Sequence, residues 1–353
     1  MKKRLLAWFE RLQRRHRVLG FPLAAFKRFS EHRGGHLAAT VSYYAFFSVF
    51  PLLLAFVTIL GIVLDDNPDL RDDLVDGALG QIPVIGSQIA DAQNPLTGST
   101  LVLVLGIATA VWAGLAAITA LQHALDEVWD VPEHTRPNTL IKRLKSVAFL
   151  VVFAIGIAAS TLLTSLTALV DFGALTGVIG FVGSALVNTG LLLAMFLLLP
   201  SVRRPVRGLL VGAIPGGVIL AVLLQFGRLV FRALEGASDT YGTFAVVIGL
   251  LGWFHLVTRV VLLSAMLNDV VTNRLWPRSV TTDAEPTDAD RKAALLDMHR
   301  IRRDPRFGCA LSVNDEVIGT EETPASIDHG VDGDVVAEDE DEGSAEPAVT
   351  RSR

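Results

Sequence analysis

Long apolar stretches alternate with polar connections along most of this chain. Six of them are long enough to cross the hydrocarbon core of a bilayer, which takes about 20 helical residues. They lie at residues 37–64, 100–121, 147–170, 178–199, 208–230 and 242–266. None shows the alternation of apolar and polar residues that a membrane strand requires, and a spanning helix satisfies its own backbone hydrogen bonds. The pattern therefore predicts an all-α, polytopic membrane protein with six transmembrane helices.

Lys and Arg residues are distributed unevenly over the connections. Residues 1–36 contain ten, residues 122–146 four and residues 200–207 three, whereas the intervening connections contain only Arg71 and Arg232. Basic residues in short connections are retained on the cytoplasmic side during insertion. We therefore expect a multi-pass cell-membrane protein with both termini in the cytoplasm.

Residues 1–36 form a basic segment that precedes the first span. Leu5, Trp8, Phe9 and Leu12 lie at helical spacing within it, which predicts an amphipathic helix. Such a helix can lie in the membrane interface and bind anionic lipid headgroups. Nucleic acid is the other partner that a basic segment suggests, but the adjacent span favours lipid, and we expect no nucleic acid.

Two further regions follow the basic segment. Residues 37–270 form the membrane domain, in which the long extracytoplasmic connection is 65–99, and residues 271–353 form a cytoplasmic tail with a helix expected at 287–306. The formal net charge of −5 hides a contrast, because residues 283–353 contain 19 acidic and 8 basic residues. A sequence this acidic has too little apolar surface to offset the entropy lost on ordering. We therefore expect the tail to be disordered towards its end.

Polar side chains within the spans are the candidate functional residues, because a polar group at bilayer depth usually faces other helices or water. Many recur at helical spacing and share one helix face. The residues expected to line a cavity are His36, Thr40, Tyr43, Ser160, Thr164, Thr167, Asp171, Ser184, Asn188, His255 and Arg259. His255 and Arg259, one turn apart, suit a polar or anionic substrate. Alternatively, Arg259 reaches the cytoplasmic headgroups and His255 bonds a neighbouring helix.

Small residues at four-residue spacing predict close contact between helices. They form two ladders, Gly106, Ala110 and Gly114 in the second span and Gly208, Gly212 and Gly216 in the fifth.

The sequence offers little for catalysis. The eight histidines include no His-x-His pair and no His-Glu-x-x-His helix, and no Walker-type phosphate loop occurs. We expect no enzyme activity, no metal and no cofactor. The single cysteine, Cys309, excludes an intramolecular disulfide.

Three segments resemble the YihY/virulence factor BrkB family of bacterial inner-membrane proteins, formerly labelled ribonuclease BN. They are residues 36–52, residues 129–136 with the basic stretch 142–145, and residues 241–268. The resemblance implies six spans with a cytoplasmic N-terminus and a role in the envelope. Family members often carry Glu where this chain has Met266, so a proton-coupling role for that carboxylate does not carry over.

Two functions fit these features. The first is a transporter that moves a lipid or another solute across the bacterial envelope. The alternative is a membrane protein that supports the envelope as a scaffold and transports nothing. The sequence specifies neither the substrate nor the oligomeric state.

Overall fold

Helices make up most of the chain in a computed structural model. The model describes residues 17–63, 100–169, 174–241, 243–279, 286–301, 309–313 and 316–321. The helices are α2 (Arg17–Glu31), α3 (Gly34–Val63), α6 (Thr100–Val128), α7 (Thr139–Leu169), α8 (Ala174–Leu198), α9 (Val206–Tyr241), α10 (Thr243–Thr272) and α11 (Asp288–Ile301), with the short 3-10 helix η1 (Glu133–Thr135). Strands β1 (Cys309–Val313) and β2 (Glu316–Glu321) pair antiparallel.

The six apolar segments each coincide with one long helix, α3 and α6 to α10, which confirms the helical prediction. Among the described residues, four stretches are long and apolar enough to cross a membrane: Gly106–Val128, Gly177–Leu198, Val206–Gly227 and Val247–Thr272. Several helices continue past their apolar segment, since helical hydrogen bonding does not stop where hydrocarbon ends. The predicted connection 65–99 and the acidic end of the tail lie outside the described residues.

The described part of the tail contains two strands, which the all-α prediction did not include. Strands β1 and β2 form a two-stranded sheet whose register shifts between Leu311 and Ser312. Val317 and Ile318 are β-branched residues that favour strands, and the residues between the strands are Asn-Asp, which favour a turn. The tail helix predicted at 287–306 is confirmed over Asp288–Ile301, and residues 302–306 lie outside the described residues.

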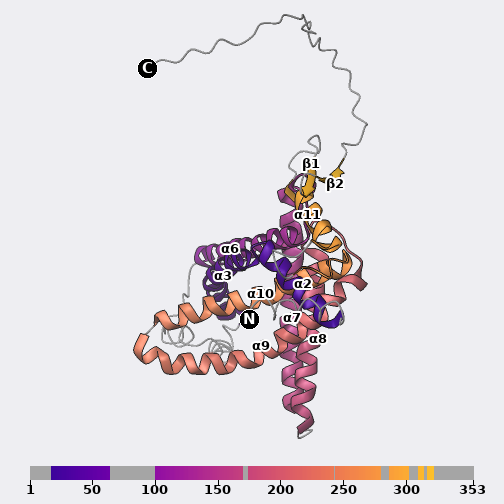
Figure 1. Cartoon of the computed structure of the whole chain (residues 1–353). Helices are drawn as coiled ribbons and strands as arrows, with labels where there is room; N and C mark the ends of the chain where they lie inside the picture. Colours follow the sequence, from indigo (N-terminus) through magenta and orange to yellow (C-terminus); the bar gives the residue numbers. More distant parts are fainter. Residues whose placement is uncertain are drawn as a thin grey trace, which may run out of the picture.

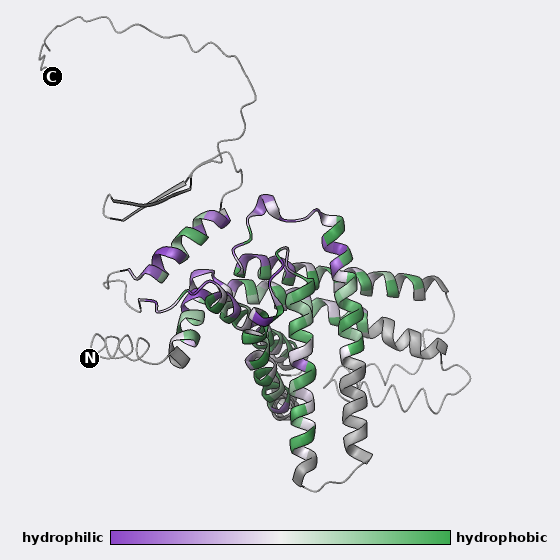
Figure 2. Ribbon diagram, turned by 90° about the vertical axis from the view of Figure 1, so that its right-hand side faces the viewer, coloured by the Kyte–Doolittle hydropathy of each residue, from purple (hydrophilic) through white to green (hydrophobic). Residues whose placement is uncertain are grey.

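The long helices pack as three pairs, α3 with α6, α7 with α8 and α9 with α10, and the pairs contact one another through α8 with α9 and α3 with α10. Figure 1 shows these pairs diverging from a common end, beside which α2 and α11 lie. Figure 2 shows that the long helices are hydrophobic along most of their described length. Many of their large apolar side chains are exposed; Trp112 of α6, for example, is 75% exposed. Apolar surface of this extent is what lipid covers in a membrane protein.

The small-residue ladder of α9 is confirmed as a packing device. A Cβ atom at Gly212 would collide with the backbone carbonyl of Ser264, and one at Gly216 with the Ser264 side chain. The Gly212 N–H also donates to Asn268 Oδ1 at 2.6 Å, which joins α9 to α10. Gly106, in the ladder of α6, does not contact another helix in this way, because a Cβ atom there would have no neighbouring atom within 4 Å. Spacing alone cannot distinguish the two ladders.

We predict that Gly212→Ala lowers the melting temperature of the detergent-purified protein. The added methyl group meets a backbone oxygen that cannot turn aside, and overpacking of this kind costs about 1–3 kcal/mol. Gly252→Ala on α10 is the control, since its Cβ would meet nothing within 4 Å and alanine favours a helix. Equal melting temperatures for the two variants would contradict the close contact of α9 and α10.

Candidate functional site

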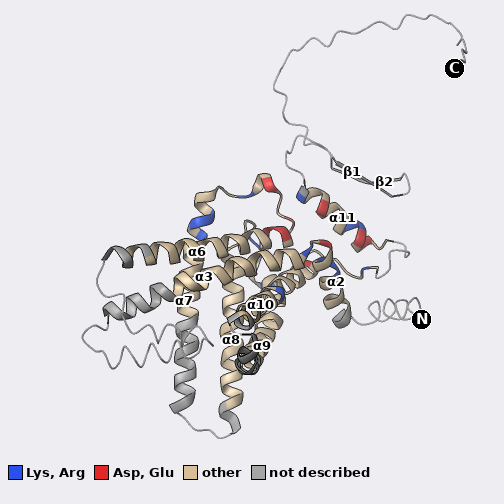
Figure 3. Cartoon of the chain, turned by 90° about the vertical axis from the view of Figure 1, so that its left-hand side faces the viewer, with Lys and Arg blue, Asp and Glu red and all other residues tan. Residues whose placement is uncertain are grey.

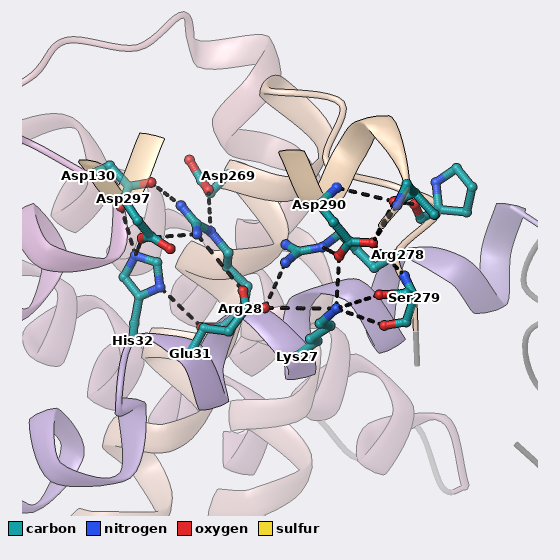
Figure 4. A network of polar contacts seen from close by, with 12 residues as sticks. Lys27, Arg28, Glu31, His32, Asp130, Asp269, Arg278, Ser279, Asp290 and Asp297 are labelled. Carbon is teal, nitrogen blue, oxygen red and sulfur yellow. Dashed lines mark hydrogen bonds and ion pairs between the residues drawn. The ribbon is translucent and has the colours of Figure 1, made fainter. Parts of the chain in front are cut away.

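Arg28 of α2 lies at the centre of a cluster of buried charges. Its side chain is 0% exposed and forms an ion pair with Asp130, which follows α6. It also lies 3.2 Å from Asp297 of α11 and 3.6 Å from Asp269 of α10. His32 Nε2 lies 2.8 Å from Asp130 Oδ1. These five residues, the ionic joint, bring four segments of the chain together (Figure 4).

The turn after α6 sets the position of Asp130. The residue has a φ of 53°, and the Val131 N–H donates to the Asp126 carbonyl at 3.0 Å. This hydrogen bond is typical of a helix end that closes through a left-handed residue. Asp tolerates this conformation better than most residues, so the turn can carry a carboxylate to Arg28.

Pairing makes the burial of these charges tolerable. Burial alone would lower the pKa of the Arg28 guanidinium, but Asp130 and Asp297 raise it above its ordinary value. Arg28 is therefore a permanent cation inside the protein. Loss of one partner of a buried pair costs about 3–5 kcal/mol, because it leaves the other charge uncompensated.

A second group of contacts fastens the tail to α2. Asp290 of α11 accepts hydrogen bonds from Lys27 Nζ at 2.8 Å, Arg278 Nε at 2.6 Å and the Ser279 N–H at 2.9 Å. Arg278 also donates to Glu31 Oε1 at 2.7 Å. We name Lys27, Glu31, Arg278, Ser279 and Asp290 the tail clasp; it lies beside the ionic joint in Figure 4.

Asp290 also caps its own helix. The Thr287 hydroxyl accepts a hydrogen bond from the Asp290 N–H at 3.1 Å, and the Thr287 N–H donates to Asp290 Oδ2 at 3.0 Å. The two residues thus form a capping box at the start of α11. Burial alone would raise the pKa of Asp290, but the hydrogen bonds from Lys27, Ser279 and Arg278 outweigh it and hold this pKa far below its usual range.

Two connections between the long helices are fixed at the same end. Trp129 Nε1 donates to the Ala265 carbonyl of α10 at 3.1 Å. Arg204, between α8 and α9, stacks over the Trp129 ring at 4.7 Å and donates to Asp269 Oδ1 at 2.9 Å. Met266, where family members often have Glu, is fully buried beside Ala265. The segments that carry the family resemblance around residues 129 and 265 therefore meet in space.

His32, Asp130 and Asp297 have ligand atoms within 4.8 Å of one another, a spacing that could hold a metal ion. The Arg28 guanidinium, however, already donates to both carboxylates. A divalent cation there would be repelled by this fixed positive charge. We therefore interpret the cluster as a set of ion pairs that ties helix ends together.

The predicted cavity residues lie apart from the ionic joint. His36, Thr40 and Tyr43 are exposed on α3, and the Thr40 hydroxyl donates to the His36 carbonyl at 3.1 Å. On α8, Asn188 Nδ2 donates to the Ser184 carbonyl at 2.8 Å. Both pairs share a helix face as predicted.

The remaining candidates belong to α7 and α10. Ser160, Thr164 and Thr167 lie in α7, where the structure does not describe their side chains, and Asp171 lies outside the described residues. His255 is half-buried, whereas Arg259 is exposed and lies over the Phe29 ring of α2 at 5.6 Å.

The ionic joint is not predicted by the sequence pattern, and part of the basic segment is buried, contrary to expectation. Arg28, expected among residues that face lipid headgroups, is buried between carboxylates instead. The available signal was acidic residues, Asp126, Asp130 and Asp269, beside the ends of spans whose connections are otherwise basic. Such acids call for basic partners, but the sequence does not say which.

The sequence of this chain matches a known protein family. A family model described as Virulence factor BrkB matches residues 25–289. The chain is 26% identical over 268 residues to a UPF0761 membrane protein of Azotobacter vinelandii, covering 72% of this chain and 64% of that protein. It is 24% identical over 282 residues to the inner membrane protein YhjD of Escherichia coli, covering 72% and 82%.

A further relative is the putative ribonuclease-like protein YfkH of Bacillus subtilis, 24% identical over 286 residues, covering 72% of this chain and 96% of that protein. The chain spans less than two thirds of the length of the Azotobacter protein. No solved structure matches the chain.

We predict that Asp130→Asn lowers the stability of the detergent-purified protein, by about 3–5 kcal/mol if Arg28 stays buried without a full partner. Asn keeps the size of the side chain and tolerates the left-handed backbone, so the change isolates the charge. The measurement is the midpoint of thermal unfolding. Glu133→Gln, at an exposed position three residues later, changes the net charge equally and is expected to have a small effect. A similar loss in both variants would contradict the buried pairing.

Asp290→Asn is expected to lower stability in a pH-dependent way. The folded pKa of Asp290 is depressed, so the carboxylate stabilises the fold above its unfolded pKa of about 3.9 and loses this contribution as the pH falls below it. The difference in melting temperature between wild type and variant is therefore full at neutral pH and shrinks in acid. Asp288→Asn, at an exposed position on the same helix, is the control. A difference independent of pH would refute the tail clasp.

Proposed function

The chain belongs to the Virulence factor BrkB family of membrane proteins, and from this premise we propose that it is a six-span protein of the bacterial inner membrane. In this proposal it translocates a lipid or a polar, preferably anionic, solute. The observation that carries the translocation is an exposed arginine in the sixth span, Arg259, that has no carboxylate partner among the residues that the structure describes. The ribonuclease-like name of the Bacillus protein is not extended to this chain.

The ionic joint supports the proposed topology. Arg28 near the amino end and Asp297 near the carboxyl end are in direct contact, so both lie on the same side of any membrane that the helices cross. This contact supports an even number of spans between the two residues. Asp130 and Arg204 bring the two basic connections to this same end, and basic connections are retained in the cytoplasm.

Arg259 differs from the arginines that hold this end together. Arg28, Arg204 and Arg278 each pair with a carboxylate. Arg259 is exposed within the apolar stretch Val247–Thr272. Among the described residues its guanidinium contacts the Phe29 ring and no carboxylate.

A cation costs about 2.5–3.5 kcal/mol at the centre of a span and less near its end, and such residues usually mark a path for a substrate or an ion. Phe29 belongs to α2, so Arg259 lies where α2 meets α10, towards the end that carries the ionic joint. His255 precedes it by one turn. The two residues fit the cytoplasmic entry of a path for anionic groups better than its midpoint.

The topology can be tested with the single native cysteine. We predict that Cys309 reacts with a membrane-impermeant maleimide only after spheroplasts of a bacterial host are permeabilised. In the Cys309→Ser background, Asp69→Cys is expected to react in intact spheroplasts, because residue 69 belongs to the predicted extracytoplasmic connection. Labelling of both positions from one side would refute the six-span arrangement.

The translocation itself can be tested in liposomes that contain the full chain. Wild-type protein is expected to move fluorescent phospholipid analogues between leaflets, or to admit a small fluorescent anion, faster than protein-free liposomes. Arg259→Ala is expected to slow this movement about tenfold or more, if the cation contributes at least 1.4 kcal/mol to the passage. Arg291→Ala, at an exposed position of α11, is the control and keeps the wild-type rate.

Insertion of each variant is checked by its recovery in the membrane fraction. Wild-type protein without activity on either probe would contradict translocation and favour the scaffold function. Equal rates for Arg259→Ala and wild type would remove Arg259 from the path.

A further inference from the structure

The first turns of α7 and the connection from α8 to α9 bring three cations to one place. Lys145 Nζ donates to the Pro200 carbonyl at 2.7 Å, which holds α7 against this connection. Lys142, one turn earlier, lies with its Nζ 3.8 Å from Asp126 Oδ2. Arg203 follows Pro200 in the connection and is exposed. Figure 3 shows basic residues gathered at the start of α7, in blue.

These cations are not neutralised as those of the ionic joint are. The acid beside them, Asp126, already accepts hydrogen bonds from the Ser201 N–H at 2.8 Å and from the Ser201 hydroxyl at 2.7 Å. Burial lowers the pKa of the Lys145 ammonium, and the charges of Arg203 and Lys142 lower it further against the opposing effect of Asp126. Lys142 and Lys145 thus lie near one carboxylate and close enough to Arg203 for repulsion, and an anion would relieve the repulsion among the three cations.

We propose that Lys142, Lys145 and Arg203, the cationic ledge, bind the phosphate of an anionic phospholipid headgroup. A phosphate oxygen suits ammonium and guanidinium donors, which form charge-assisted hydrogen bonds with it. The ledge is separate from the basic segment at the amino end and from Arg259.

Apolar side chains beside the ledge identify the anion as a lipid rather than a soluble phosphate. Leu144, between the two lysines in sequence, is 70% exposed, and Val202, next to Arg203, is 42% exposed. Leu140 on the first turn of α7 is also exposed. Exposed leucines at the start of a spanning helix are covered by acyl chains, while the adjacent cations stay at headgroup level.

The inference rests on the proposed function only in that α7 enters the bilayer from the cytoplasmic side. Binding at the ledge requires no translocation. A failed translocation assay therefore leaves the ledge in place, and a ledge that binds no lipid leaves the translocation proposal in place.

The test measures the thermal stability of the full chain in a neutral detergent, with and without added lipid. Phosphatidylglycerol is the anionic probe, phosphatidylcholine the zwitterionic one and inorganic phosphate the soluble one. A ligand that binds only the folded protein raises its melting temperature, and the increase grows with the ratio of ligand concentration to dissociation constant. We expect phosphatidylglycerol to raise it and the other two probes to raise it much less.

The double variant Lys142→Gln, Arg203→Gln removes two cations of the ledge and keeps the Lys145 contact with Pro200. It is expected to lose most of the shift produced by phosphatidylglycerol. The matched control is Arg143→Gln, Arg291→Gln, which removes two exposed basic residues outside the ledge and is expected to keep the shift. Should the double variant fold poorly, Arg203→Gln alone serves, because Arg203 is exposed.

Three results would overturn the proposal. The first is an equal loss of the shift in the control variant, which would indicate general attraction by surface charge. The second is an undiminished shift in the ledge variant. The third is a shift with inorganic phosphate or phosphatidylcholine as large as that with phosphatidylglycerol.

Discussion

The burial of Arg28 is the constraint on which the rest of the structure depends. A guanidinium that leaves water keeps its charge, so carboxylates must surround it. Here they come from the end of α6, from α10 and from α11, and His32 completes the cluster. The helix pairs can diverge along their apolar length because this shared end holds them. The same contacts fix α2 and α11 on one side of the membrane helices, which underlies the proposed topology.

The positively charged side chains of the described residues lie in two kinds of environment. Arg28, Arg204 and Arg278 are paired and serve the architecture. Arg259 and the cationic ledge lack a matching number of carboxylates among the described residues, and they lie next to exposed apolar side chains or an aromatic ring. Unpaired cations at the boundary between water and hydrocarbon attract anionic groups. Under the two proposals, the charges that build the fold and those that bind an anion are therefore distinguished by their partners and not by their position in the sequence.

The sequence predicted the six long helices because hydrocarbon thickness sets a local, readable length. It could not predict the ionic joint, since Arg28 and Asp130 are 102 positions apart and pattern alone does not choose among many possible partners. The start of α11 is different: its capping box of Thr287 and Asp290 is local, and the helix predicted from residue 287 begins within one residue of the observed start. The ladders at Gly106 and Gly212 look alike in sequence, yet the close contact at Gly212 depends on Ser264 of another helix. For the candidate site, helical spacing groups residues along one helix, such as Ser184 with Asn188, but it does not show which helices meet.

Hydrogen–deuterium exchange of the full chain in lipid nanodiscs tests the central claim most directly. The claim is that α2 and α11 are docked on the ends of the membrane helices through buried ion pairs. It predicts slow exchange of the amides around residues 24–32 and 288–300, comparable to the ends of α6 and α10. Exchange in α2 and α11 as fast as in an unstructured peptide, with the long helices still protected, would contradict it.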